Sequence, residues 1–308
     1  MDPMRGALLW AAGNPTLRRH LPNFGFVRAT VRRFMPGESV DDALAAAAAL
    51  ADDGIPTTFT YLGENVTSLA EADLVAEHYV ELYDRIAEGG RDTEVSVKPT
   101  HLGLELAPEH AYRNVERLAE HAAAKGNRLW IDMESTAFVQ QTVDQYARLA
   151  ADHGNTGLCL QAYLKRTWDD VVRLLPFDPS IRLVKGAYRE PPELAFQHHD
   201  VIDEAFLRIA AAIAERGGHG RLALATHDTD LLARIEEAGV PKDAFEIQML
   251  YGIRVDQQYR LHDAGYRVRV LISYGDYWYP WFMRRMAEKP SNIFLAVRNV
   301  MARDPSRA

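Results

Sequence analysis

The feature of this sequence that most constrains its fold is an alternation, repeated eight times, between short β-branched segments and longer segments with helical spacing of apolar residues. The predicted strands span residues 57–63, 94–100, 128–133, 157–162, 181–187, 221–227, 245–250 and 266–273. Strands that alternate with helices pair in parallel through right-handed crossovers, and eight such units close a barrel. We therefore predict an α/β fold, a (β/α)8 TIM barrel, with a doubly wound open sheet as the alternative.

Helical segments are predicted between the strands, and capping residues mark several of their ends. They include residues 69–86, 109–124, 137–153, 193–216 and 229–238. Ser135 or Thr136 precedes the third, Asp228 or Thr229 precedes the last, and a glycine pair at 217–218 follows the longest.

The residues before the first predicted strand carry a group of basic side chains, which are Arg18, Arg19, Arg28, Arg32 and Arg33. We expect residues 1–40 to form a short N-terminal helical arm and residues 41–308 to form the barrel, a single catalytic domain. No linker rich in Pro, Gly or Ser divides the chain.

The charge and the cysteine content limit which binding partners and which cellular compartment we expect. The 308 residues carry a formal charge of -8 and no block of five basic residues, which argues against a nucleic-acid partner. One cysteine, Cys159, cannot form an internal disulfide, and we find neither a secretory signal nor an apolar run of about 18 residues. We expect a cytoplasmic protein, with peripheral contact at the inner membrane face left open.

Polar side chains stand at or beyond the carboxyl ends of most predicted strands, where TIM barrels place their chemistry. They are Lys98, Asp132, Glu134, Gln161, Arg182, Lys185, Tyr188, Thr226, His227, Asp228, Glu246 and Gln248. Each alone is compatible with a solvated charge on the rim, but together they converge on one mouth. Lys98, Arg182 and Lys185 would make that mouth locally cationic, which indicates an anionic ligand or cofactor.

The segment after the last predicted strand has the most distinctive pattern. Pro280 suits a first helical turn, and Trp281, Arg284, Arg285 and Glu288 then follow at the spacing of one helical face. Two adjacent arginines can hold a carboxylate while the glutamate orients one of them. A surface helix with ordinary Arg–Glu pairing has the same spacing, so the pattern alone leaves both interpretations open.

Four motifs carry a family resemblance. They are LVKGAYRE at 183–190, ATHD at 225–228, FEIQMLYG at 245–252 and YPWFMRRMAEKPSN at 279–292. Together they resemble the proline dehydrogenases, and the similarity extends in order from RFMPGE at 33–38 to RNV at 298–300, almost the whole chain. The length is similar to that of the stand-alone bacterial enzymes, without the aldehyde dehydrogenase module of bifunctional relatives.

The resemblance implies that the barrel is distorted, as it is in that family, and that the chain carries out an FAD-dependent oxidation of L-proline to 1-pyrroline-5-carboxylate, the first step of proline catabolism. In that family, hydride passes from proline C5 to flavin N5, and membrane quinones accept the electrons. A separate 1-pyrroline-5-carboxylate dehydrogenase is then an expected functional partner. A G-x-G-x-x-G fingerprint is absent from the sequence, so the mouth of the barrel would hold the FAD.

The resemblance also implies roles for individual residues. Asp132 and Arg182 match catalytic positions beside the flavin. The matches to substrate-binding positions are Lys98, Tyr188, Leu250, Arg284, Arg285 and Glu288. The matches to FAD-binding positions are Met133, Gln161, Lys185, Gly186, Ala187, Thr226 and His227. A glycine at 186 is expected to let the backbone approach the cofactor closely.

Two positions depart from the family pattern. Leu271 stands where some relatives have a tyrosine near proline C4, which leaves open how strictly 4-hydroxyproline is excluded, because a pocket without that ring has more room. Trp281 stands where relatives often have tyrosine, which removes a hydroxyl and keeps an apolar wall.

Other interpretations of the residues are a Schiff-base aldolase that uses Lys98 or Lys185, another flavin barrel such as methylenetetrahydrofolate reductase, and a non-catalytic barrel scaffold. The arginine pair with its glutamate argues against the first two, and the full set of strand-end charges argues against the third. His198 and His199 have no metal-ligand spacing with an acidic residue, so we expect no metal. Cys159 is expected to be a buried strand residue and not a nucleophile.

Overall fold

Eight parallel strands close into a barrel in the computed structural model, which describes residues 14, 31–279 and 282. Each strand pairs with the next, and the last pairs with the first. The strands are β1 (Thr57–Tyr61), β2 (Thr93–Val97), β3 (Leu129–Ile131), β4 (Thr156–Gln161), β5 (Ser180–Val184), β6 (Leu222–Ala225), β7 (Phe245–Leu250) and β8 (Arg267–Tyr274). The prediction of a (β/α)8 barrel is confirmed, and the open sheet is wrong.

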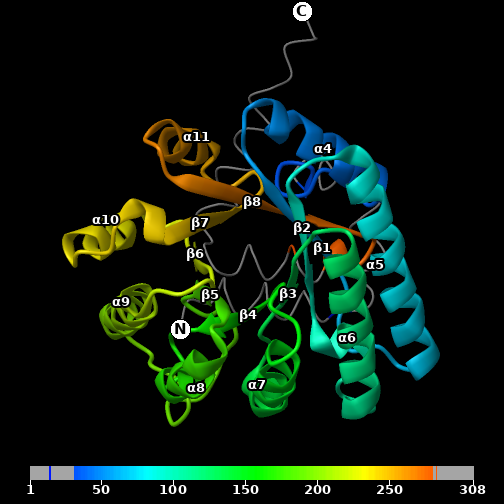
Figure 1. Ribbon diagram of the computed structural model, residues 1–308, viewed down its shortest axis with the longest axis horizontal. Helices are drawn as coiled ribbons and strands as arrows, with labels where there is room; N and C mark the ends of the chain where they lie inside the picture. The colour runs from blue at the N-terminus through cyan, green and yellow to red at the C-terminus, as the bar shows by residue number, and fades with distance from the viewer. Residues whose placement is uncertain (1–13, 15–30, 280–281, 283–308) are drawn as a thin grey trace, which may run out of the picture.

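Helices surround the strands and bury their apolar faces against them (Figure 1). They are α4 (Val40–Asp52), α5 (Leu69–Gly89), α6 (Pro108–Ala124), α7 (Thr136–Ala150), α8 (Thr167–Leu174), α9 (His199–Arg216), α10 (Thr229–Glu237) and α11 (Val255–Asp263), with 3-10 turns η2 (Pro99–Leu102), η3 (Leu175–Phe177) and η4 (Lys242–Ala244). Helix α4 packs on β8 and β1, so it covers the seam at which the barrel closes. The predicted caps at Asp228 and Gly217 are confirmed, whereas Ser135 occupies the N-cap position of α7 without a capping hydrogen bond from its side chain.

The predicted strands at 57–63, 94–100, 128–133 and 221–227 extend past the observed ends of β1, β2, β3 and β6. Two further boundaries are wrong for physical reasons that local periodicity does not indicate. The helix predicted from residue 193 begins at His199, because Ala195 forms an antiparallel bridge with Leu164. The fifth strand ends at Val184 and not at residue 187, because Gly186 has a φ of +120°, which breaks the extended backbone. The residues after Val184 therefore form a loop at the end of the barrel.

Part of the predicted N-terminal arm lies within the described residues, namely Asn14 and residues 31–40. Val31 and Met35 belong to a small apolar cluster with residues from the other end of the chain, Trp278, Tyr279 and Phe282. Glu38 accepts a hydrogen bond of 2.8 Å from Nε1 of Trp278. The two ends of the described chain are thereby tied together beyond the carboxyl ends of β1 and β8. The division of the chain at residue 40 stays a prediction.

The interior of the barrel is polar, which is unusual because branched aliphatic side chains commonly fill it. By strand register and hydrogen bonding, the inward residues include Glu94, Ser96, Trp130, Arg182, Glu246, Gln248 and Arg269. Small residues such as Gly157 and Ala223 leave room for them: a Cβ on Gly157 would lie 2.5 Å from the Trp130 ring. The apolar core lies instead between the strands and the helices.

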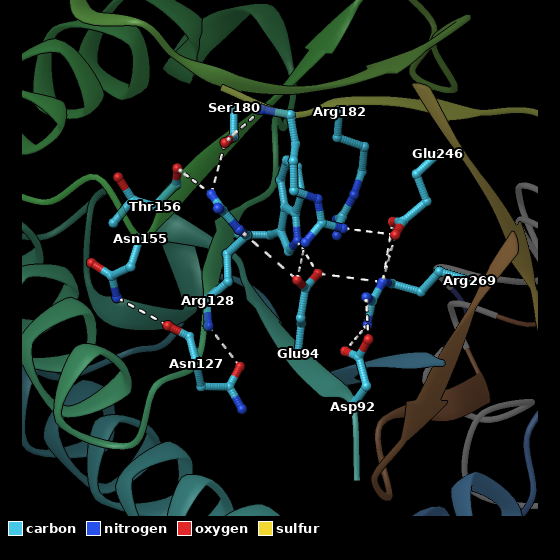
Figure 2. Close-up of polar contacts among 12 residues, drawn as sticks. Asp92, Glu94, Asn127, Arg128, Asn155, Thr156, Ser180, Arg182, Glu246 and Arg269 are labelled. Carbon is cyan, nitrogen blue, oxygen red and sulfur yellow. Dashed lines mark hydrogen bonds and ion pairs between the residues drawn. The ribbon is translucent and has the colours of Figure 1, made fainter. Parts of the chain in front are cut away.

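A network of ion pairs fills the end of the barrel at which the strands begin (Figure 2). We call it the floor network; it consists of Asp92, Glu94, Arg128, Arg221, Glu246 and Arg269. Arg221 pairs with Glu94 and donates to Glu246 at 2.8 Å, and Arg269 donates to Glu246 at 3.1 Å. Burial would raise the pKa of Glu94, but Arg269 and Arg221 lower it overall. The carboxylates of Glu94 and Glu246 are therefore both buried and paired with arginines.

Candidate active site

The predicted site residues that lie within the described part of the chain gather at one end of the barrel. Lys98 follows β2, Asp132 and Met133 follow β3, and Gln161 ends β4. The others there are Lys185, Gly186, Ala187 and Tyr188 after β5, Thr226 and His227 after β6, and Leu250 at the end of β7. Because all strands run parallel, these positions share the carboxyl end, which we call the mouth. Trp281, Arg284, Arg285 and Glu288 lie outside the described residues.

Arg182 is held in one orientation on the inner wall of the barrel. Its side chain is buried, with the residue 2% exposed. Nε donates to Oε1 of Gln248 at 2.6 Å, and Nη1 donates to Oγ of Ser96 at 2.8 Å and to Oδ1 of Asp132 at 2.9 Å. Nη2 is equally buried and has no hydrogen-bond partner among the residues that the structure describes. A buried donor without a partner is costly, which points to a ligand as its partner.

Asp132 connects Arg182 to the rim of the mouth. Its side chain is 21% exposed, and Oδ1 accepts from Ser96 Oγ at 2.7 Å as well as from Arg182. The Asp132 backbone N–H donates to the Val97 carbonyl at 2.8 Å, which fixes the start of the loop after β3. The result is a partly solvated carboxylate in contact with a buried guanidinium.

Gln161 organises the loop that follows β3. Nε2 donates to the carbonyls of Met133 at 3.0 Å and Glu134 at 3.1 Å, while Oε1 is a buried acceptor without a partner within residues 31–279 and 282. Glu134 accepts from the N–H and Oγ1 of Thr100, and burial raises the pKa of the Glu134 carboxyl although Lys98 lies near. This wall of the mouth offers an unbonded acceptor close to charged groups.

Lys185 lies between two carboxylates. Nζ is 2.5 Å from Oδ1 of Asp203 and 2.7 Å from Oδ2 of Asp228. Burial would lower the pKa of Lys185, but the two carboxylates raise it overall. A Schiff-base lysine must lose its proton, so this environment opposes the aldolase alternative at Lys185.

His227 is oriented between β6 and β7. Its Nε2 accepts a hydrogen bond of 3.3 Å from the backbone N–H of Leu250, and its carbonyl accepts from Nη1 of Arg254 at 2.6 Å. Nε2 is therefore the acceptor nitrogen, which assigns the proton of the neutral ring to Nδ1. Thr226 Oγ1 accepts from the Asp228 N–H at 3.1 Å and shapes the same turn.

Gly186 is required for a reason that the sequence does not indicate. In addition to its positive φ, a Cβ at this position would lie 2.2 Å from Cδ1 of Tyr163. The glycine thus accommodates the protein's own aromatic ring, and the expected close approach to a cofactor stays a prediction. Leu271 aligns in the β7–β8 pairing with Leu250, the last residue of β7, but lies in the middle of β8, which continues to Tyr274.

A model of the proline dehydrogenase family matches residues 43–293. The chain belongs to the proline dehydrogenase family. Proline dehydrogenase 1 of Bacillus subtilis subsp. natto is 34% identical over 302 residues, which are 97% of this chain and 99% of that protein. The proline dehydrogenase of Deinococcus radiodurans is 35% identical over 278 residues, 87% of this chain and 89% of that protein. The resemblance seen in the motifs is confirmed.

Solved structures of longer proteins share the fold of this proline dehydrogenase family member. Proline utilization A from Bdellovibrio bacteriovorus superposes with a TM-score of 0.81 at 24% identity, over 94% of this chain and 37% of that chain. Proline utilization A from Bradyrhizobium japonicum superposes with a TM-score of 0.73 over 86% of this chain. Membership in the family makes the chain an oxidoreductase of a generally flavin-dependent class.

In the site of this proline dehydrogenase family member, three residues next to Arg182 have no role predicted from the sequence. They are Ser96, Trp130 and Gln248. Ser96 and Trp130 contact Arg182 directly, the ring of Trp130 lying 4.6 Å from the guanidinium carbon. Gln248 is one of the polar strand residues for which the sequence indicates no function. The alternation of side chains along a strand could have indicated Ser96, because Ser96 lies two residues before Lys98 and therefore faces the same side of the strand.

Several other groups bear on the chemistry. Burial raises the pKa of the Cys159 thiol to about 12, so it is not a ready nucleophile. Among the described residues, no group of three His, Cys, Asp or Glu side chains is arranged to hold a metal ion. The helices within the described ranges include none that is long and apolar enough to cross a membrane.

A cavity of about 820 Å³ lies at the end of the barrel opposite the mouth. It is bordered by Arg128, Arg221 and Glu94. Arg221 is committed to Glu94 and Glu246, and Arg128 donates to the Thr156 carbonyl and the Ser180 hydroxyl. The mouth, where Arg182 Nη2 and Gln161 Oε1 have no partner among the described residues, is therefore the stronger candidate for the active site.

Proposed function

We propose that the chain oxidises L-proline to 1-pyrroline-5-carboxylate with FAD as its cofactor, at the mouth of the barrel. The observation that supports this most is the Asp132–Arg182 pair, in which a buried guanidinium is fixed by three protein groups and keeps one donor for a ligand. The relatives named proline dehydrogenase, which align over nearly the whole chain, support the same choice of substrate.

The donor set of the mouth suits a flavin. An isoalloxazine ring offers both hydrogen-bond acceptors and a donor on its pyrimidine edge, and the mouth offers an unmatched donor, Arg182 Nη2, and an unmatched acceptor, Gln161 Oε1. Each such buried atom costs roughly 1–3 kcal/mol when it has no partner. The residues proposed to hold the cofactor are Met133, Gln161, Lys185, Gly186, Ala187, Thr226 and His227. When bound, FAD supplies the two-electron oxidation itself.

The protein's contribution is then electrostatic and steric. The guanidinium of Arg182 stabilises negative charge on the group beside Nη2, and Asp132 keeps the guanidinium in place. Because Ser96 and Gln248 hold the remaining donors, no reorganisation is needed when charge develops. Leu250 and Tyr188 are proposed to line the substrate pocket and to exclude water from it.

The substrate carboxylate is proposed to bind to three cations. Lys98 lies at the mouth, one residue beyond β2. Arg284 and Arg285 complete the clamp by resemblance to the family, and Glu288 orients one of them. Guanidinium groups bind a carboxylate in bidentate fashion, which fixes both the position and the rotation of a small amino acid.

A quinone is the proposed electron acceptor, reached by peripheral contact with the inner face of the membrane. The product is proposed to pass to a separate 1-pyrroline-5-carboxylate dehydrogenase in the cytoplasm. The proline utilization A proteins, in which the matched barrel is a minor part of a longer chain, support a link between this reaction and further enzymatic steps.

An absorbance spectrum tests the proposal. The purified protein is expected to show the flavin bands, and L-proline added without oxygen is expected to bleach them, while D-proline is not. A protein that takes up no FAD, or whose flavin stays oxidised in excess L-proline, would contradict the proposed function.

A further inference from the structure

Gln248 makes a contact that passes over one intervening strand of the barrel wall. It is 4% exposed and lies on β7, whereas Arg182 lies on β5. The strand between them, β6, places Ala223 beside Arg182 and Ala225 beside Gln248. Alanine carries no polar group and little volume, so the amide of Gln248 reaches over β6 to Nε of Arg182, at 2.6 Å.

The orientation of the Gln248 amide is fixed by Glu246, which lies two residues earlier on β7, toward the floor network. Nε2 donates to Oε1 of Glu246 at 2.8 Å, and Glu246 belongs to the floor network, where it also accepts from Arg221 and Arg269. A carboxylate offers only acceptors, so the NH2 end of the amide must face Glu246. The carbonyl end must then face Arg182, and a flipped amide would place two acceptors and two donors against each other.

This orientation decides which donor Arg182 keeps for a ligand. The guanidinium is planar, and Gln248 holds Nε while Ser96 and Asp132 hold Nη1. Two adjacent nitrogens held in this way leave Nη2, the atom without a partner among the described residues. Without Gln248, rotation about the last side-chain bonds would let other nitrogens take that place.

We propose that Gln248 is a positioning residue for Arg182. It transmits the fixed geometry of the floor network to the guanidinium and so aims Nη2 at the bound cofactor or substrate. The importance of that aim for catalysis rests on the proposed function, but the positioning itself is a property of the protein without FAD.

The first test uses the apoprotein, labelled with 15N in its arginine side chains. The Nε–H signal of Arg182, assigned by its loss in Arg182→Lys, is expected to exchange slowly with water because it is buried and bonded. Gln248→Met has similar length and no hydrogen bonds, and it is expected to speed that exchange by about tenfold or more. Unchanged protection would overturn the proposal, whether or not the protein binds FAD.

A matched control separates positioning from general loss of stability. Asn114 is another buried amide, on α6, where it donates to Asp73 and to the Leu102 carbonyl. Asn114→Leu is expected to lower the melting temperature while the Arg182 signal keeps its protection. If Asn114→Leu speeds the exchange as much as Gln248→Met does, the effect is structural and the proposal fails.

The second test uses the holoenzyme and a rescue. In Gln248→Glu, the introduced carboxylate faces Glu246 in place of an NH2 group, so at neutral pH kcat is expected to fall about tenfold or more, with KM for proline changed less than about threefold. At lower pH the protonated carboxyl accepts from Arg182 and donates to Glu246, as the amide does. The ratio of variant to wild-type kcat is therefore expected to rise as pH falls. A ratio independent of pH would overturn the proposal, whereas a wild-type protein that binds no FAD would defeat only the proposed function.

Discussion

Two buried arginines, one at each end of the barrel interior, differ in how completely the protein satisfies them. Arg269, in the floor network, donates from Nε to Glu246, from Nη1 to Asp92 and the Thr57 carbonyl, and from Nη2 to Asp92. Arg182, toward the mouth, is bonded at Nε and Nη1, and its Nη2 lacks a partner among the described residues. Burial is similar, at 3% and 2% exposed.

The difference teaches how one polar interior serves two purposes. When the protein supplies all the partners of a buried charge, removing that charge is strongly destabilising, because the partners are left buried and uncompensated. A buried charge with one donor left over contributes less to stability and is available to a ligand. This agrees with the general division of TIM barrels into a stabilising end and a catalytic end.

The largest effect is expected from breaking the floor network. Arg269→Met removes the cation that pairs with Glu94 and Glu246, and we expect a loss of about 3–5 kcal/mol in the free energy of unfolding. Urea denaturation of the variant and the wild type measures it. Asp92→Asn is the control, because the Asp92 side chain is 66% exposed and such pairs contribute only about 0–1 kcal/mol. Equal losses in the two variants would show that burial does not distinguish these pairs.

The complementary change at the mouth is expected to affect catalysis more than stability. Arg182→Lys keeps a positive charge but loses the fixed fork, so kcat/KM for proline should fall about 10²–10³-fold. The loss of unfolding free energy should be smaller than in Arg269→Met. Steady-state kinetics and denaturation on the same preparation measure both. A variant that unfolds as readily as Arg269→Met and keeps its turnover would reverse the comparison.

A third prediction extends the comparison to the arginine pair beyond the mouth. Arg284→Ala and Arg285→Ala each remove a proposed partner of the substrate carboxylate, so KM for proline should rise about 10–100-fold, the value of a charged hydrogen bond. FAD content, measured by absorbance after purification, should stay at the wild-type level. Wild-type KM in both variants would contradict the clamp.

The smallest effect expected is a difference in how the two ends respond to acid. His101, buried just beyond β2 and stacked on Tyr61, has its pKa lowered to about 3 by burial and by Lys98. An unfolded histidine titrates near pH 6.5, so the stability held by the neutral ring is present above that pH and is lost as pH falls below it. From pH 7 to pH 5 this loss amounts to about 2 kcal/mol.

Glu94 in the floor network also loses its contribution to stability as pH falls, but in a more acidic range. Its pKa is lowered, so that contribution is lost only below the ordinary titration range of a glutamate. Melting temperatures of wild type and His101→Gln between pH 7 and pH 5 isolate the histidine contribution, because His78, whose pKa burial also lowers, is present in both. If the melting temperatures of the two proteins fall in parallel as pH falls, His101 does not contribute to the acid sensitivity of the mouth.

Local patterns predicted the barrel and the strand-end residues because both depend on short-range periodicity and on parallel strands ending together. They could not predict the role of Gln248, which is 66 residues from Arg182 in sequence and on a strand that is not its neighbour. The bridge between Ala195 and Leu164, which delays helix α9, is likewise a contact between distant residues. Alternation along β2 and β7 can place Ser96 on the same side as Lys98 and Gln248 on the same side as Glu246, but only the closed barrel defines their partners.

The floor network has a consequence for the order in which the chain is made. Glu94 lies near the start of the barrel sequence, whereas Arg269 lies on the last strand, so ribosomal synthesis delivers the carboxylate long before its cation. A nascent chain that lacks β8 would have to bury Glu94 and Glu246 without Arg269, which opposes premature closure. Arg221 alone pairs with both carboxylates until the eighth strand supplies Arg269, so the full network can form only when the whole barrel sequence has been made.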